Sequence, residues 1–381
     1  MKGAILSIEK DREETILKLL ERGLVKGVFD TLLIPLKVPA EDSFAYVLLK
    51  NQALLDRASP LPPVMPVQGA KALSSLTMMG KSKQKIAVVM RPCEISAAIE
   101  LYKLKQIDLE NIFLVSIDCP GVLQLSDYTK DPKKGIEKFT ETFDQWGSDF
   151  TRPVCKICTK FSMIASDLHI GLLGSEDKSI FLIPGTEKGK YILESLDILP
   201  ENDMEDWETK VKDVRKKREK KRQMEHEELK SKIEGPDKFL EIYSKCINCR
   251  NCMRVCPICY CRECYFNSGA LKLYPENYMI RAKNKGGLRL PPDTLLFHLG
   301  RMSHMIFSCV SCGSCEDACP VSIPVAQIFS LVADETQKLF NYVPGRSIDE
   351  PLPLVTYKEE EFREIEIPYV ETYQPEEIKS G

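Results

Sequence analysis

Two cysteine runs of identical spacing carry the clearest chemical signal in the sequence. Each run has the pattern Cys-x2-Cys-x2-Cys-x3-Cys-Pro, over residues 246–257 and again over 309–320. This spacing presents three thiolates from one tight loop to three irons of a cubane, and it places a fourth cysteine at the head of the next helix. Structural zinc prefers two separated Cys-x2-Cys pairs instead. The runs therefore predict two [4Fe–4S] clusters.

In two-cluster ferredoxins the fourth cysteine of each run serves the other cluster. We therefore expect two ligand sets that exchange their last cysteines. The first cysteine set is Cys246, Cys249, Cys252 and Cys319. The second cysteine set is Cys256, Cys309, Cys312 and Cys315. Apolar residues recur at three- and four-residue steps over Pro292–Met305 and Ile323–Phe340, which predicts a helix in each segment.

Three further cysteines, Cys259, Cys261 and Cys264, stand between the runs. Two interpretations stay open for them: they anchor a further cluster with one ligand from elsewhere, or they pack in the core and alter the pairing of the other sets. His298 and His304 precede the second run. They either tune a cluster by hydrogen bonding or occupy ordinary surface and core positions.

The first half of the chain has the pattern of an α/β domain. Continuous apolar strands are predicted over Lys85–Met90 and Asn111–Asp118, with a helix over Pro92–Lys105 between them. Such a pattern is typical of a parallel sheet covered on both faces. Further strands are expected over 27–36 and 44–50, and a helix over 12–22. The predicted fold class is an α/β domain with a mostly parallel sheet, followed by an all-α helical ferredoxin domain.

The other four cysteines form a third candidate site. Cys93 and Cys119 each follow a predicted strand, at the sheet edge where open α/β folds hold ligands. Cys155 and Cys158 form a Cys-x2-Cys pair on a later loop. We expect these four residues, the N-terminal cysteine set, to bind a third [4Fe–4S] cluster. The alternatives are four unrelated buried thiols or a redox-active Cys155–Cys158 disulfide.

A nucleotide or flavin site has only a weak signal. The sequence contains neither the GxGxxG dinucleotide fingerprint nor the GxxxxGK phosphate loop. Gly69, Ala70 and Lys71 precede an apparent helix, where a glycine and a lysine would suit a flavin phosphate. An ordinary helix cap is the alternative interpretation.

Charge and hydropathy exclude several classes of protein. The 53 basic and 56 acidic residues nearly cancel, so the chain has no overall nucleic-acid footprint. The basic block Arg215–Arg222 lies in a charged segment that we interpret as a linker helix or a docking surface. No apolar run is long enough to span a membrane. The N-terminus acquires charged residues too early for a signal peptide, so we expect a cytoplasmic protein.

These patterns divide the chain into four parts. Residues 1–200 are the predicted α/β domain that binds flavin and the third cluster, and 201–240 are the charged helical linker. Residues 241–342 are the two-cluster helical domain, and 343–381 are an extended, proline-punctuated tail.

The chain resembles a known family in three short motifs and in the two cysteine runs. The motifs are Arg91-Pro-Cys-Glu94, Ile117-Asp-Cys-Pro-Gly121 and Val154-Cys-Lys-Ile-Cys158. The chain is similar to coenzyme F420 hydrogenase/dehydrogenase β subunits, above all to formate dehydrogenase β subunits and their relatives associated with heterodisulfide reductase. Hydrogenase β subunits usually have a Thr-Pro-Cys-Gln-like stretch at the first of these motifs, which is a departure in this chain.

The resemblance implies FAD, [4Fe–4S] clusters and electron transfer between a catalytic partner subunit and a soluble carrier such as coenzyme F420. The implied partners are a formate dehydrogenase catalytic subunit or a heterodisulfide-reductase-like complex. A flavin-free relay and docking subunit is the alternative from another class. A subunit linked to NAD(P)H or ferredoxin is a further alternative.

Overall fold

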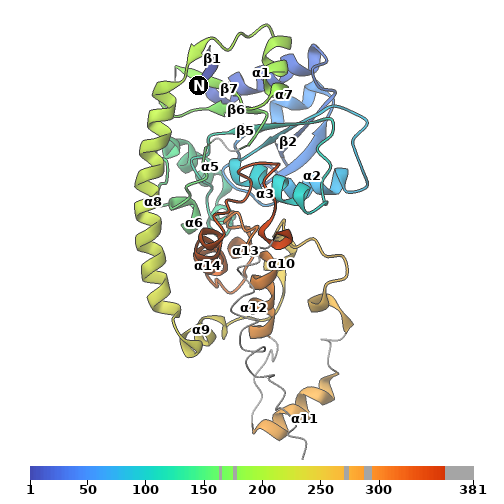
Figure 1. Cartoon of the computed structure of the whole chain (residues 1–381), viewed down its shortest axis with the longest axis vertical. Helices are drawn as coiled ribbons and strands as arrows, with labels where there is room; N and C mark the ends of the chain where they lie inside the picture. Colours follow the sequence, from blue (N-terminus) through green and yellow to red (C-terminus); the bar gives the residue numbers. More distant parts are fainter. Residues whose placement is uncertain (163–164, 175–177, 270–273, 287–293, 357–381) are drawn as a thin grey trace, which may run out of the picture.

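An eight-stranded sheet forms the upper part of the molecule, as seen in Figure 1. The computed structural model describes residues 1–162, 165–174, 178–269, 274–286 and 294–356. The strand order is β3-β2-β4-β5-β6-β7-β1-β8. The strands are β1 (Lys2–Ser7), β2 (Thr31–Lys37), β3 (Phe44–Leu49), β4 (Ile86–Met90), β5 (Ile112–Ile117), β6 (Leu168–Gly171), β7 (Ser179–Pro184) and β8 (Asn202–Asp203).

The sheet is mixed, and this corrects the prediction of a mostly parallel one. Strands β2, β4, β5 and β6 pair in parallel, as the strand–helix–strand pattern indicates. The remaining pairings, β2 with β3, β6 with β7, β1 with β7 and β1 with β8, are antiparallel. In the pairs β2–β3 and β6–β7, consecutive strands are joined by a short connection. Parallel pairing needs a crossover of a dozen or more residues, so these strands pair antiparallel.

The two faces of the sheet pack against different helices. In β4, Ile86, Val88 and Met90 face the core formed with α2 (Gly69–Thr77) and α3 (Pro92–Lys103). Ala87 and Val89 face the opposite core, formed with α1 (Arg12–Val25) and α7 (Glu187–Ser195). Because both sets of alternating residues are buried, the strand reads as a continuous apolar run.

Helices make up most of the C-terminal half. The helices of this half are α8 (Glu205–Ile233), α9 (Pro236–Tyr243), α10 (Asn251–Val255), α11 (Pro275–Lys285), α12 (Thr294–Met305), α13 (Ser314–Asp317) and α14 (Val325–Leu339). The helices predicted over 292–305 and 323–340 correspond to α12 and α14, and residues 287–293 lie outside the described part. Three shorter helices belong to the first half: α4 (Leu125–Tyr128), α5 (Pro132–Glu141) and α6 (Pro153–Lys156).

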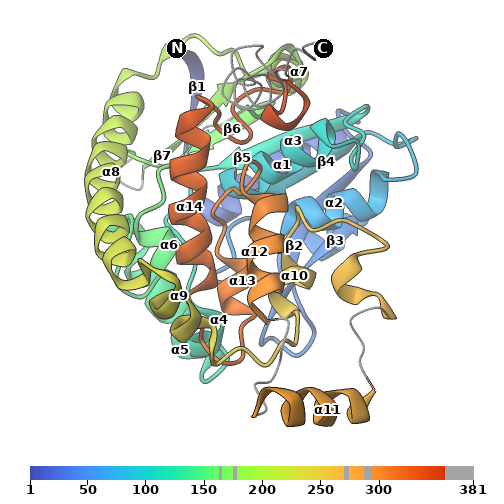
Figure 2. The same cartoon turned by 60° about the horizontal axis from the view of Figure 1, so that its bottom comes forward.

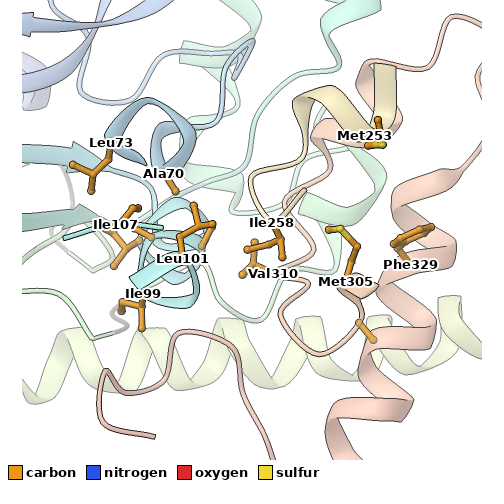
Figure 3. Packing of buried hydrophobic residues seen from close by; sticks show 14 of the residues in the cluster. Ala70, Leu73, Ile99, Leu101, Ile107, Met253, Ile258, Met305, Val310 and Phe329 are labelled. Atoms are coloured by element: carbon orange, nitrogen blue, oxygen red, sulfur yellow. The ribbon is translucent and has the colours of Figure 1, made fainter. Parts of the chain in front are cut away.

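One continuous hydrophobic core joins the sheet region to the C-terminal helices. Leu101 of α3 belongs to the same buried cluster as Ile258, Met305, Val310 and Phe329 (Figure 3). The cysteine runs therefore lie against the α2–α3 face of the sheet. This packing brings the two halves of the chain together where the candidate ligands are.

Helix α8 runs along one side of the molecule from the sheet to the helical region (Figures 1 and 2). Most of its 29 residues are charged, yet Trp207, Val211, Arg218 and His226 are buried. These positions recur close to the helical period, so one narrow stripe faces the protein and the rest faces solvent. Among the described residues, no helix is long and apolar enough to cross a membrane.

Candidate metal centres

The N-terminal cysteine set surrounds one small cavity. Cys93, at the start of α3, and Cys119, after β5, line it together with Cys155 and Cys158 from around α6. Cys93 and Cys119 meet because β4 and β5 are neighbouring parallel strands, whose carboxyl ends lie at the same edge. The four residues of the N-terminal set therefore lie around one cavity.

Buried charged groups hold this site in place. The Nη1 of Arg91 donates a hydrogen bond of 3.1 Å to the Sγ of Cys119, and Arg91 is 2% exposed. The carboxylate of Glu94 accepts from the backbone amide of Arg91 and so fixes the turn that starts α3. Burial raises the pKa of Cys155 to about 12. A thiol in such a place becomes a thiolate when it binds a metal that replaces its proton.

The second cysteine set also lines a single cavity. Cys256 reaches this cavity from the first run, and Cys309, Cys312 and Cys315 come from the second run. The second run turns tightly because Ser311 and Gly313 adopt left-handed backbone conformations, with φ of 56° and 84°. Burial raises the pKa of Cys309 to about 11. Cys256 is thus the one cysteine of the first run that lines this cavity.

The first cysteine set gathers around Cys252, which is buried in α10. Burial raises the pKa of Cys252 to about 11, and the charges of Cys246, Cys249 and Cys319 add to this rise. The structure therefore brings Cys319 of the second run close to the three cysteines of the first. The backbone amide of Ile323 also donates to the Sγ of Cys319 at 3.4 Å.

Of the two histidines singled out in the sequence, only His298 contacts a candidate ligand. Its Nε2 lies 3.3 Å from the Sγ of Cys246, and its ring stacks on Tyr243. Burial, with a smaller contribution from Arg301, lowers the pKa of His298 to about 3. The ring is therefore neutral, and because a thiolate can only accept, Nε2 is its donor. His304 is exposed.

The three extra cysteines have separate surroundings. Cys259 lies beside Cys256, and a hydrogen bond from its thiol lowers the pKa of Cys256. The Sγ of Cys259 contacts the Sδ of Met305, whereas that of Cys264 contacts the Sδ of Met253. Cys261 is exposed. These contacts favour packing over a fourth cluster.

Two buried arginines were missed by the sequence reasoning. Arg218 lines the cavity of the N-terminal set, and its Nη2 has no hydrogen-bond acceptor among the described residues. Arg301 lines the cavity of the second set, and within the described ranges its Nε and Nη1 are likewise unpaired. A buried guanidinium donor without an acceptor is costly, so both cavities fit a group that accepts hydrogen bonds, such as a thiolate-bound cluster. The sequence did contain a signal for Arg301, because it is the one arginine or lysine in the largely apolar segment 294–305.

The arrangement also suits clusters better than single ions. In the part of the chain that the structure describes, no three His, Cys, Asp or Glu side chains converge closely enough to hold one metal ion. In a cubane each thiolate binds a different iron, so the four sulfur atoms need not meet at one point.

The predicted flavin contacts at the start of α2 are occupied by the protein itself. The amide of Gly69 donates to the buried carboxylate of Glu94 at 2.6 Å, and that of Ala70 donates to the Gln68 side chain at 2.8 Å. The Nζ of Lys71 donates to the carbonyl of Arg254. The sequence alternative, an ordinary helix cap, describes these contacts, and the residues do not fit a flavin phosphate in this arrangement.

A large cleft of about 1140 Å³ opens between α8, α14 and the segment after α14. Its lining is strongly charged and includes Lys160, Arg215, Asp334 and Lys338. Lys160 also lines the cavity of the N-terminal cysteine set, so the cleft and that cavity are neighbours.

The sites form a row through the molecule. Lys160 connects the charged cleft with the N-terminal cavity, and Ser311 and Cys312 line both that cavity and the cavity of the second set. The charge of Arg301, in turn, acts on Cys315 of the second set and Cys252 of the first.

Comparisons with known proteins identify an iron–sulfur domain in the C-terminal half of the chain. Residues 241–323 match the family described as a 4Fe-4S dicluster domain. The F420-dependent formate dehydrogenase subunit beta of Methanocaldococcus jannaschii is 28% identical over 303 residues, which cover 71% of this chain and 76% of the relative. A solved F420-reducing [NiFe] hydrogenase complex from Methanosarcina barkeri shares 14% identity, with a TM-score of 0.40. The match covers 61% of this chain and 92% of that one.

A second relative extends over more of the chain. The F420-dependent formate dehydrogenase 1 subunit beta of Methanococcus maripaludis is 30% identical over 382 aligned positions, which cover 88% of this chain and 89% of the relative. Through this match, the chain belongs to the family of F420-dependent formate dehydrogenase beta subunits.

Proposed function

We propose that this chain is the electron-relay subunit of an oxidoreductase complex and that it binds three [4Fe–4S] clusters. The observation that carries the proposal is the row of three cysteine sets, of which neighbouring sets share lining residues or a buried arginine. Iron–sulfur clusters supply single-electron transfer when they are bound. The residues of this chain supply the ligands, the order of the sites and their burial.

Two of the proposed ligand sets each line one cavity, and the third set is the group of cysteines around Cys252. The N-terminal set binds one cluster, the second set binds another and the first set binds the third. The unpaired guanidinium donors of Arg218 and Arg301 support this assignment, because each points to an anionic group in its own cavity.

A flavin is the second part of the proposal. We place it in the charged cleft between α8 and α14 rather than at Gly69–Lys71, because the cleft adjoins the N-terminal cavity through Lys160. A flavin exchanges an electron pair with a soluble carrier and single electrons with a cluster. Arg215 and Lys338 provide positive charge for its phosphates.

The names of the relatives suggest the carrier and the partner. Both relatives are β subunits of F420-dependent formate dehydrogenases. We propose coenzyme F420 as the carrier and a formate dehydrogenase catalytic subunit, or a heterodisulfide-reductase-like complex, as the partner. Two alternatives remain: a flavin-free relay and docking subunit, and an oxidoreductase subunit linked to NAD(P)H or ferredoxin.

The test uses the full chain purified without oxygen and mixed separately with reduced F420, NADH and reduced ferredoxin. Electron paramagnetic resonance reports cluster reduction. We expect reduced F420 to reduce the clusters in a chain that holds flavin. A chain with intact clusters that reduced F420 leaves oxidised contradicts the carrier, and reduction by ferredoxin without bound flavin establishes the flavin-free alternative.

A further inference from the structure

Helix α12 presents one face to two of the candidate cluster sites. His298 contacts Cys246 of the first cysteine set, whereas Arg301 lines the cavity of the second. Residues three apart on a helix are neighbours on the same face. Arg301 therefore stands at the boundary between the two sites.

The Arg301 side chain is buried without a counter-ion. It is 3% exposed, and its guanidinium stacks over the ring of Phe329 at 4.5 Å. Its Nε and Nη1 donate to no acceptor, and no carboxylate among the described residues forms an ion pair with it. Arginine remains charged in proteins, so this cation needs an anion at the cavity it lines.

Cysteine sulfur atoms from both sets supply that negative charge when they bind iron as thiolates. Cys315 and Cys256 of the second set and Cys252 of the first interact electrostatically with Arg301, as does Cys259, which also forms a hydrogen bond with it. No other charged side chain lines the cavity of the second set in the described part of the chain.

We propose that Arg301 is a positioning residue shared by the two ferredoxin-type cluster sites, where its guanidinium donates to cluster or cysteine sulfur and raises the reduction potentials of both clusters. This inference rests on the proposed function, because it requires the clusters. Reduction adds one negative charge to a cluster, so a fixed neighbouring cation stabilises the reduced form more than the oxidised form. Hydrogen bonds to sulfur and net charge are recognised determinants of cluster potential.

The test compares Arg301→Met with the wild type in anaerobic redox titrations followed by electron paramagnetic resonance. Methionine preserves the length of the apolar stem and removes both charge and donors. We expect both midpoint potentials to fall by at least the equivalent of a tenfold change in the reduction equilibrium, about 59 mV for one electron. Arg254→Met is the matched control: Arg254 is exposed on α10 within the first run, so its charge is screened by solvent.

The outcomes separate this inference from the proposed function. Wild-type protein without clusters would refute the function itself. Clusters present in Arg301→Met with unchanged potentials, or a shift in one cluster only, would refute the shared role while leaving the function intact. If Arg301→Met fails to fold, Arg301→Lys replaces it. There we expect both potentials to fall by a smaller amount, because an ammonium keeps the charge and loses the planar fork of donors, and an unchanged pair of potentials overturns the proposal.

Discussion

At the scale of single residues, the chemistry depends on which thiols share a cavity. Cys119 lies at the sheet edge with the other three cysteines of its set and receives a hydrogen bond from Arg91. Arg91 stabilises a thiolate there, as an iron ligand requires.

We predict that Cys119→Ser lowers the iron content by about four atoms per chain, because one of the three clusters loses a ligand. Iron is measured colorimetrically on protein purified without oxygen. Cys261→Ser is the matched control, since Cys261 is exposed, and it should keep the full content. Unchanged iron in Cys119→Ser would remove the N-terminal set from the list of ligands.

The hydrogen bond from His298 to Cys246 leads to a second prediction. His298→Leu should lower the potential of the cluster at the first set alone, by about 65 mV, which corresponds to about 1.5 kcal/mol for one hydrogen bond to a charged acceptor. The exposed His304→Leu should have no effect. A redox titration that finds both variants equal to the wild type would show that this contact does not tune the cluster.

At the scale of elements, the charged helix α8 both packs against the sheet region and contributes a side chain to the N-terminal cavity. Its buried stripe, which includes Trp207 and Val211, packs on the sheet region. Further along, Arg218 donates to the carbonyls of Trp146 and Cys158 and lines the N-terminal cavity. Within the basic block, Arg218 is therefore buried against the protein, whereas Lys216 and Lys217 are exposed to solvent.

We predict that Arg218→Met weakens the N-terminal site, because the cavity loses a buried cation that faces the cluster. Incubation with an iron chelator should then release about four iron atoms per chain several-fold faster than from the wild type. Lys217→Met, the adjacent exposed position, should release iron at the wild-type rate. Equal rates in all three proteins would contradict a role for α8 at this site.

Much of the element pattern was predictable from local signals. The apolar β4 and β5, the amphipathic α14 and the placement of Cys93 beside Cys119 all follow from periodicity and parallel pairing. The antiparallel pairing of β1 with β7 was not predictable from local signals, because the two strands are far apart in the sequence, at Lys2–Ser7 and Ser179–Pro184. The role of Gly69 was also missed, because the carboxylate that occupies its amide belongs to Glu94, on another helix.

At the scale of the whole molecule, one core joins the sheet region to the two ferredoxin-type sites. Leu101 of the sheet region and Met305 of the helical region belong to the same buried cluster (Figure 3). Each cysteine run contains a single short helix, α10 in the first and α13 in the second, and the rest of the run is irregular backbone. Their order therefore depends on bound iron more than the order of the sheet does.

We predict that removing iron with a chelator makes the two runs sensitive to limited proteolysis while the sheet region stays resistant. Cleavage should concentrate within 244–264 and 307–322, because these segments lose the metal bonds that close their loops. Mass spectrometry of the fragments locates the cuts, and the iron-loaded protein is the control. Cleavage that is equally fast with and without iron would show that the metal does not organise these segments.

The central claim is that three cysteine sets hold three clusters, and iron per chain after anaerobic purification tests it most directly. The account predicts about 12 iron atoms, together with one flavin. About 8 iron atoms would contradict it, because the N-terminal cysteines would then bind no cluster and the relay would end at the second set.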